Sequence, residues 1–192
     1  KRLAVTGSPA PVLENVHYHT GGGQAYYALS ASGHLAYVPG PVLGHSARPV
    51  WVDRQGKAEP LPVPPRAYMA PRISPDGKQV AIEISGAAHN LYMWDPARTT
   101  LTKLTFDAQS HWPVWTPDGK RLTFRSLATG IWAMHTMPAD RSGPTEPLTS
   151  PPTFHQSGQS WSPDGRVLAL TAQVRETSYD VFVLELDRGA PG

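Results

Sequence analysis

One short motif recurs along the chain at a nearly constant spacing, and it constrains the fold more than any other feature. Its full form is Ser/Thr-Pro-Asp-Gly-Lys/Arg, and full copies begin at Ser74, Thr116 and Ser162. A degenerate copy begins at Ser30, which keeps a glycine but lacks the Pro-Asp pair. Successive copies lie 42 to 46 residues apart. Such a period indicates one supersecondary unit that is repeated and stacked against its own copies.

Each repeat carries the pattern of four short strands. In the second repeat, Val80, Ile82 and Ile84 alternate with other residues after the motif, so they share one face of a strand. Further strands are expected at residues 90–95 and just before residues 104–105. No segment has the apolar spacing of a helix. We therefore predict an all-β fold, a β-propeller of four-stranded antiparallel blades with four recognisable repeats, because a period of about 40–45 residues is typical of such a blade.

The motif itself has the chemistry of a tight turn. Proline presets φ, aspartate accepts hydrogen bonds from nearby backbone amides, and glycine supplies a positive φ. A residue that returns in every blade is more simply structural than catalytic. We therefore interpret these residues as turn-forming: Asp76, Gly77, Asp118, Gly119, Asp164 and Gly165.

Composition excludes several classes of function. A net charge of +2 without a basic run gives no reason to expect a nucleic-acid partner. No apolar stretch is long enough to cross a bilayer, so direct membrane insertion is not expected. The absence of cysteine excludes disulfides, thiolate metal sites and cysteine nucleophiles.

At the Ser-Pro-Asp-Gly turns, the Leu-Tyr-Met-Trp-Asp strand at residues 91–95 and the closing Leu-Thr pairs, the chain resembles the TolB-like, WD-repeat-like β-propellers of bacteria. Residues 48–68 are similar to propeller regions that follow serine/threonine kinase domains, and that subgroup is the closest resemblance. The resemblance implies a non-enzymatic module that binds a protein or peptide, as part of a sensory or envelope protein. It also implies a periplasmic or otherwise extracytoplasmic location, with the cytoplasm left open.

We expect one propeller domain, or part of one, over residues 1–192. The blades are predicted approximately at residues 24–62, 70–105, 112–149 and 158–186. Residues 1–13 are expected to form a strand that completes the last blade or belongs to an upstream one. Propellers of this kind usually have more blades, so the chain also fits part of a larger propeller or an assembly that associates through unpaired blade edges.

The turn assignment also predicts where a binding site lies. If the motif joins the first two strands of a blade, the loops between the second and third strands and between blades lie at the opposite end of the sheets. Six of the eight histidines fall in these expected loops, and Trp112 is the best candidate there for an exposed aromatic contact. The predicted binding residues are His17, His19, Tyr68, His89, His111, Trp112 and His155.

An enzymatic alternative uses the same end of the sheets. Imidazoles that converge on the channel mouth could bind a divalent metal, for which His19, His111 and His155 are the candidates. The chain would then be a metal-dependent lyase or hydrolase acting on oligosaccharides, similar to pectate-fragment lyases with a propeller fold. Against this, histidines in polar loops are commonly only solvated. We favour the binding module and expect no other cofactor.

Overall fold

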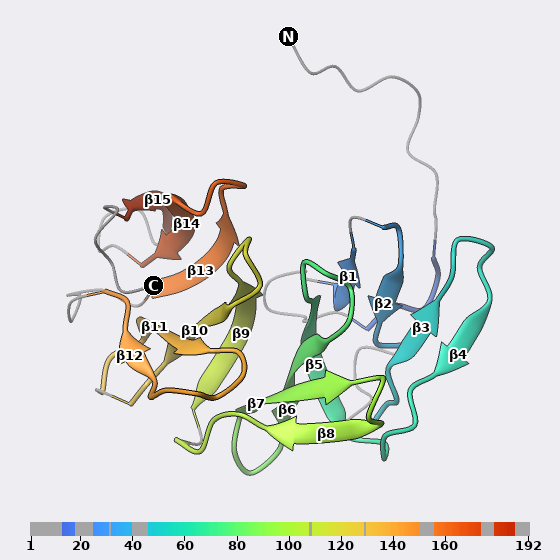
Figure 1. The fold of residues 1–192 in the computed structure, drawn as a ribbon. Helices are drawn as coiled ribbons and strands as arrows, with labels where there is room; N and C mark the ends of the chain where they lie inside the picture. The colour runs from blue at the N-terminus through green and yellow to red at the C-terminus, as the bar shows by residue number, and fades with distance from the viewer. Residues whose placement is uncertain are drawn as a thin grey trace, which may run out of the picture.

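Four antiparallel sheets follow one another along the chain, and each is built from strands that are consecutive in sequence (Figure 1). The computed structural model describes residues 13–17, 25–30, 32–39, 46–107, 109–128, 130–149, 156–173 and 179–186. All regular secondary structure in these residues is β-strand, which confirms the predicted all-β fold. The strand predicted within residues 1–13 lies outside the described residues except for Leu13.

Three sheets have four strands and the last has three among the described residues. The first contains β1 (Tyr27–Leu29), β2 (Leu35–Tyr37), β3 (Val50–Val52) and β4 (Ala58–Pro60). The second contains β5 (Ala67–Ile73), β6 (Val80–Ser85), β7 (Asn90–Asp95) and β8 (Thr100–Lys103). The third contains β9 (Ser110–Trp115), β10 (Arg121–Ser126), β11 (Ala133–Pro138) and β12 (Glu146–Pro147). The last contains β13 (Gln156–Trp161), β14 (Val167–Ala172) and β15 (Asp180–Glu185).

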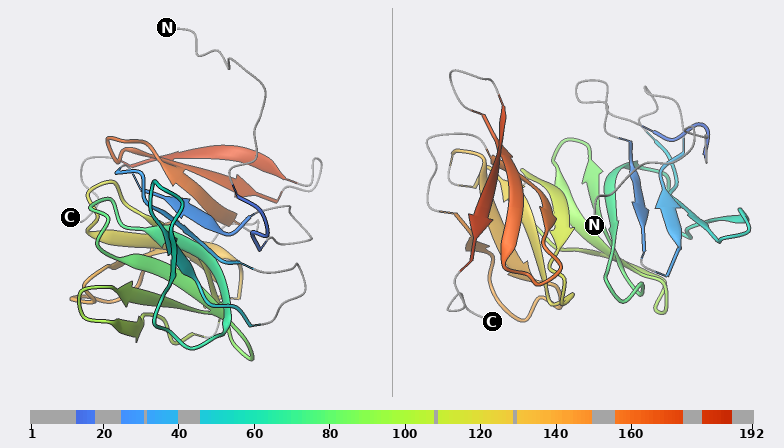
Figure 2. Two further views of the ribbon diagram at one scale, coloured as in Figure 1. Left: turned by 90° about the vertical axis from the view of Figure 1, so that its right-hand side faces the viewer. Right: turned by 90° about the horizontal axis from the view of Figure 1, so that it is seen from above.

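The sheets stand side by side in chain order, with the first strand of each toward the middle (Figure 2). These innermost strands, β1, β5, β9 and β13, contact one another in that sequence. Apolar residues fill the spaces between sheets. One core cluster includes Tyr26 and Ile82, and another includes Leu91 and Phe124.

Two tryptophans at equivalent positions tie neighbouring sheets together. Trp115 at the end of β9 donates its Nε1–H to the carbonyl of Arg72 in β5, at 3.0 Å. Trp161 at the end of β13 donates its Nε1–H to Thr123 Oγ1 in β10, at 3.1 Å. Each indole is thus anchored on the preceding sheet, which fixes the spacing between blades.

The innermost strands share a local irregularity. The register of β5, β9 and β13 against the next strand shifts at the same place in each repeat. Ala70 and Trp112 lie at this place with φ of 44° and 54°. A bulge of this kind inserts an extra residue and bends the strand, and a non-glycine residue at positive φ persists only where the surroundings hold it.

The motif turns lie between the first and second strands of the sheets, as the sequence predicts. In each full copy the first residue donates its hydroxyl to the aspartate, with Oγ or Oγ1 to Oδ1 distances of 2.6 Å. The amide two residues after the aspartate donates to the same Oδ1. These hydrogen bonds, the side-chain one first, hold the pKa of Asp76, Asp118 and Asp164 below its ordinary value.

In the part of the chain that the structure describes, no helix has the length and apolar character that crossing a membrane would require.

The turn geometry predicts the effect of removing one aspartate. Asp118→Ala should lower the free energy of unfolding by about 0.5–2 kcal/mol, by analogy with the loss of a side-chain cap. Urea denaturation measures this change. Asp118→Asn is the matched control, since its amide oxygen can still accept from Lys120 N–H, and it should retain most of the stability. Equal stability of wild type and Asp118→Ala would contradict the turn-forming role.

Candidate functional site

A cavity of about 450 Å³ lies between the innermost strands. Its lining includes Tyr26, Ala70, Trp112 and Gly158, one from each repeat. All four stand four residues before the first residue of the motif. In β5 and β9 this residue lies within the bulge, and in β13 it directly precedes the register shift. One equivalent residue of every repeat therefore lines the cavity, and in three repeats a register shift of the innermost strand lies at or next to it.

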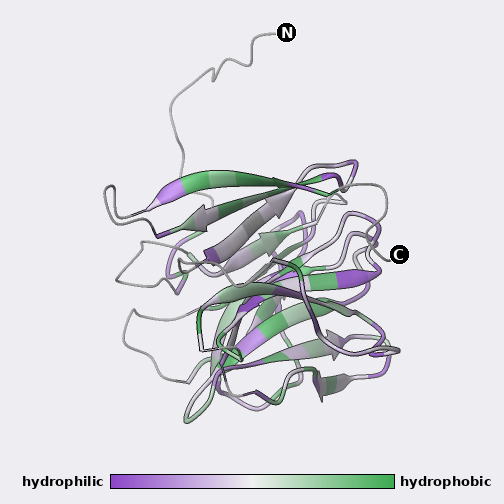
Figure 3. Cartoon of the chain, turned by 90° about the vertical axis from the view of Figure 1, so that its left-hand side faces the viewer, coloured by the Kyte–Doolittle hydropathy of each residue, from purple (hydrophilic) through white to green (hydrophobic). Residues whose placement is uncertain are grey.

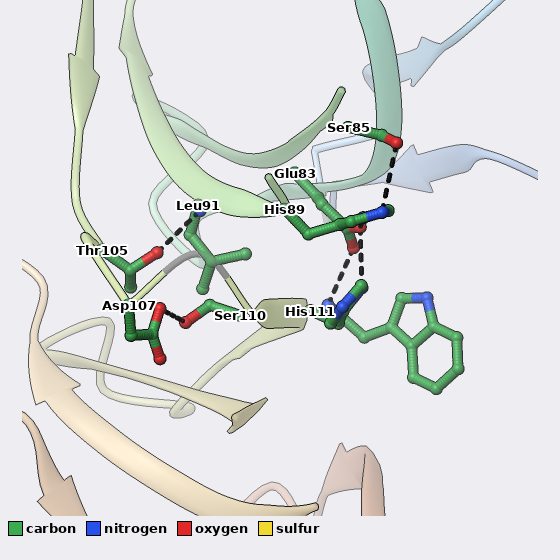
Figure 4. A network of polar contacts seen from close by, with 9 residues as sticks. Glu83, Ser85, His89, Leu91, Thr105, Asp107, Ser110 and His111 are labelled. Carbon is green, nitrogen blue, oxygen red and sulfur yellow. Dashed lines mark hydrogen bonds and ion pairs between the residues drawn. The ribbon is translucent and has the colours of Figure 1, made fainter. Parts of the chain in front are cut away.

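A buried carboxylate organises the wall beside this cavity. Glu83 in β6 has no exposed surface, and its Oε1 lies 2.7 Å from His89 Nδ1 and 2.9 Å from His111 Nδ1 (Figure 4). Its Oε2 accepts the backbone N–H of Trp112 at 3.2 Å. Burial alone would raise the pKa of Glu83, but the hydrogen bonds from His111, His89 and the Trp112 amide outweigh it and lower the pKa.

The strands and loops that carry the cluster of Glu83, His89 and His111 are themselves held by hydrogen bonds. Asp107 accepts Ser110 Oγ–H at 2.6 Å (Figure 4). It also accepts the hydroxyl of Ser126, and together the two contacts fix the start of β9 against the end of β10. On the other side, Ser85 Oγ lies 3.4 Å from His89 Nε2. The carboxylate from one sheet and the His111 imidazole from the next therefore meet in a defined geometry.

A cation lies between two indoles next to the cluster. The guanidinium carbon of Arg125 is 4.1 Å from the ring centre of Trp112 and 4.2 Å from that of Trp132. The edge of His111 contacts Trp132, with ring centres 5.0 Å apart. Burial lowers the pKa of Arg125, while the Glu83 charge acts in the opposite direction. Stacking between indoles stabilises such a guanidinium without a carboxylate partner.

Among the described residues, two polar atoms of the cavity lining have no hydrogen-bond partner. They are the buried hydroxyls of Tyr26 and Ser157, and Nε of Arg125, outside the lining, is in the same situation. Burial first, and then the Glu83 charge, raise the pKa of Tyr26 to about 12, so its hydroxyl remains a donor. Arg72 also lines the cavity. Among the described residues, neither Arg72 nor Arg125 forms an ion pair.

The structure brings together three of the predicted binding residues: His89, His111 and Trp112. His111 and Trp112 lie in β9, whereas the sequence analysis placed them in a loop, because the bulge interrupts the strand alternation. Tyr68 lies in β5, also not in a loop, and is a core residue at 2% exposure, with its hydroxyl donating to the Pro64 carbonyl. His17 stacks on Tyr26, with ring centres 5.2 Å apart. His19 and His155 lie outside the described residues.

The sequence analysis missed Glu83, Arg125 and Tyr26. One signal was available: Glu83 is the single charged residue of β6, within an otherwise apolar run. Arg125 occupies the equivalent position of β10, nine residues after the start of the motif. Opposite charges at the same position of neighbouring repeats, in strands otherwise expected to pack in the core, indicate a site that could have been found from the sequence.

Comparison with known proteins gives the fold. TolB from Acinetobacter baumannii superimposes with a TM-score of 0.73 at 23% identity, over 86% of this chain and 41% of that one. The β-propeller domain of the Trilobed protease from Pyrococcus furiosus gives a TM-score of 0.62 at 16% identity, over 85% of this chain and 55% of that one. The chain has a TolB-like β-propeller fold. The predicted propeller architecture is thereby confirmed.

Sequence comparison adds little to this. No protein-family model matches the chain. An uncharacterised protein of Agrobacterium fabrum, Atu1656, is 31% identical over 96 residues, which is 49% of this chain and 32% of that protein. The chain therefore spans well under two thirds of these proteins' own length.

Glu83 should be the most sensitive side chain of this propeller wall. Glu83→Gln should lower the free energy of unfolding by about 1–3 kcal/mol, because an amide makes weaker hydrogen bonds than a carboxylate to the two imidazoles. Urea denaturation at neutral pH measures the change. Glu59→Gln is the control, since Glu59 pairs with Lys57 on the exposed surface, and such pairs contribute little. Equal losses in the two variants would contradict the organising role of Glu83.

Proposed function

We propose that the chain is a non-enzymatic binding module, which holds a peptide or a protein loop in the cavity between its innermost strands. The observation that carries this proposal is a pair of buried hydroxyls on the cavity, those of Tyr26 and Ser157, which have no hydrogen-bond partner in the described part of the chain. A buried hydroxyl without a partner costs about 1–3 kcal/mol. A ligand that accepts hydrogen bonds from them would recover this free energy.

The charges around the cavity favour an acidic group on the ligand. Arg72 lines the cavity, and Arg125 stacks on Trp112, which lines it as well. Guanidinium groups recognise carboxylates by paired hydrogen bonds, and an indole offers a broad apolar surface for a peptide. We therefore propose that the ligand is a peptide segment with an acidic side chain or a free terminal carboxylate.

The enzymatic alternative, a lyase or hydrolase acting on oligosaccharides, has weaker support. It rests on a metal bound by His19, His111 and His155, of which only His111 lies in the described part of the chain. Peptide binding in the cavity needs no metal, and the lining residues that would carry it lie in the described part of the chain.

We further propose that the module is the propeller part of a sensory or envelope protein outside the cytoplasm. Support comes from the fold likeness to TolB and from the resemblance of residues 48–68 to kinase-linked propellers. The fold likeness and the sequence resemblance both bear on the type of larger protein to which the module belongs.

Binding can be tested with an array of short peptides that carry either a free carboxylate or an amide at the C-terminus, in a buffer with EDTA. We expect the wild type to retain acidic peptides with free carboxylates. Trp112→Ala and Arg72→Met should each weaken binding at least tenfold by calorimetry. Phe106→Ala is the matched control, because Phe106 is an exposed aromatic that does not line the cavity. Binding that persists in Trp112→Ala, or no binding at all, would contradict the proposal.

We also propose that the last sheet supports self-association. Its outer strand β15 exposes Val181 and Val183, at 75% and 66%, and its apolar residues are coloured green in Figure 3. Among the described residues β15 pairs only with β14, so it also offers an open sheet edge.

Light scattering tests the association. The wild type should have a mass above that of the 20.8 kDa chain, and Val181→Lys combined with Val183→Lys should reduce it to the monomer. Glu185→Lys adds charge on the same strand without removing apolar surface, and it should leave the mass unchanged. A wild type that is monomeric at high concentration would exclude this interface.

A further inference from the structure

The cluster of Glu83, His89 and His111 has the composition and convergence of a metal-binding site. One ligand atom from each residue lies within 4.8 Å of the others. Two imidazoles and a carboxylate form a nitrogen and oxygen donor set that suits zinc and similar divalent transition metals. We propose that these three side chains bind one such ion, and this proposal is independent of peptide binding.

The donors are already oriented for an ion. The Trp112 amide holds Oε2 of Glu83 at 3.2 Å, so Oε1 is the oxygen directed at both imidazoles. The distances from Oε1 to the two Nδ1 atoms, 2.7 and 2.9 Å, are slightly shorter than the separation of about 3.3 Å between ligands on a tetrahedral zinc. A small outward shift of the imidazoles would therefore admit the ion.

Ion binding requires a change of tautomer, because the Nδ1–H groups of His89 and His111 donate to Glu83 Oε1 in this structure. A neutral imidazole that binds a metal through Nδ1 carries its proton on Nε2. Ser85 Oγ lies 3.4 Å from His89 Nε2, where it can accept that proton in a hydrogen bond. Supporting contacts of this type are usual around metal-bound histidines, and their loss commonly weakens metal affinity about 10–100-fold.

The burial of Glu83 and the partial exposure of His89 are also consistent with metal binding. The Glu83 side chain is fully buried and forms no ion pair with a lysine or arginine among the described residues. Its charge is already stabilised by three hydrogen bonds, and a divalent cation would add the positive partner that a buried carboxylate favours. The side chain of His89 is 30% exposed, which gives an ion a path from solvent. Three protein ligands leave a fourth position for water or another ligand.

The test is titration of the whole chain with Zn²⁺ by calorimetry and with Co²⁺ by visible absorption. We expect one ion per chain, with the absorption bands of low-coordinate cobalt and a higher melting temperature with Zn²⁺. His89→Ala should weaken binding at least tenfold, and Ser85→Ala about tenfold. His34→Ala is the control for a histidine away from the cluster and should bind as the wild type does. Because the side chain of His89 is partly exposed, its substitution should leave the fold intact, so a loss of metal binding in this variant reports on the site.

Three results would each overturn the site: no saturable binding to the wild type, undiminished binding in His89→Ala, or loss of binding in His34→Ala. Peptide binding is measured in EDTA, so loss of metal binding and loss of peptide binding are separate outcomes.

Discussion

The hydrogen bonds of Glu83 join two neighbouring sheets of this propeller, and the geometry of the cavity wall depends on them. One carboxylate in β6 receives His89 from its own sheet and His111 and the Trp112 amide from the next. The amide belongs to a residue with φ of 54°, a conformation that costs free energy for a bulky side chain. Because Glu83 satisfies that amide, the bulge in β9 is stabilised, and Trp112 is held where it lines the cavity and supports Arg125.

The bulge divides each innermost strand that carries it into two halves, one that packs and ends in the motif turn and one that carries residues of the candidate site. Downstream of it, β5, β9 and β13 pair regularly and end in the motif turns. Upstream, the strands carry the residues that meet at the opposite end of the sheets, as His111 does. A strand that bends at a fixed place can keep one half constant for packing while the other half changes. The cavity is therefore a consequence of the repeat itself and needs no inserted loop.

The sequence was sufficient for the fold because the decisive signals are local. A Pro-Asp-Gly turn specifies its own hydrogen bonds, and the alternation of Val80, Ile82 and Ile84 specifies a strand, so repetition of both determines a stack of hairpins. The site depends on contacts that are distant in sequence. Glu83 and His111 are 28 residues apart and meet only through the packing of two sheets. The bulge interrupts the alternation of apolar and polar residues around Trp112, so the sequence pattern there did not indicate a strand and the residue was assigned to a loop.

Comparison of the repeats shows where the chain has been free to vary. Four residues before the motif, the residues are Tyr26, Ala70, Trp112 and Gly158, which range from a large aromatic to no side chain. Nine residues after its start they are Pro39, Glu83, Arg125 and Thr171, again unlike in size and charge. The turn residues between these two positions remain nearly constant. Packing between blades tolerates such variation only where a side chain faces a cavity or a partner of matched chemistry. The two variable positions converge on the Glu83, Trp112 and Arg125 contacts, so the specificity of this module should reside in the differences between its repeats.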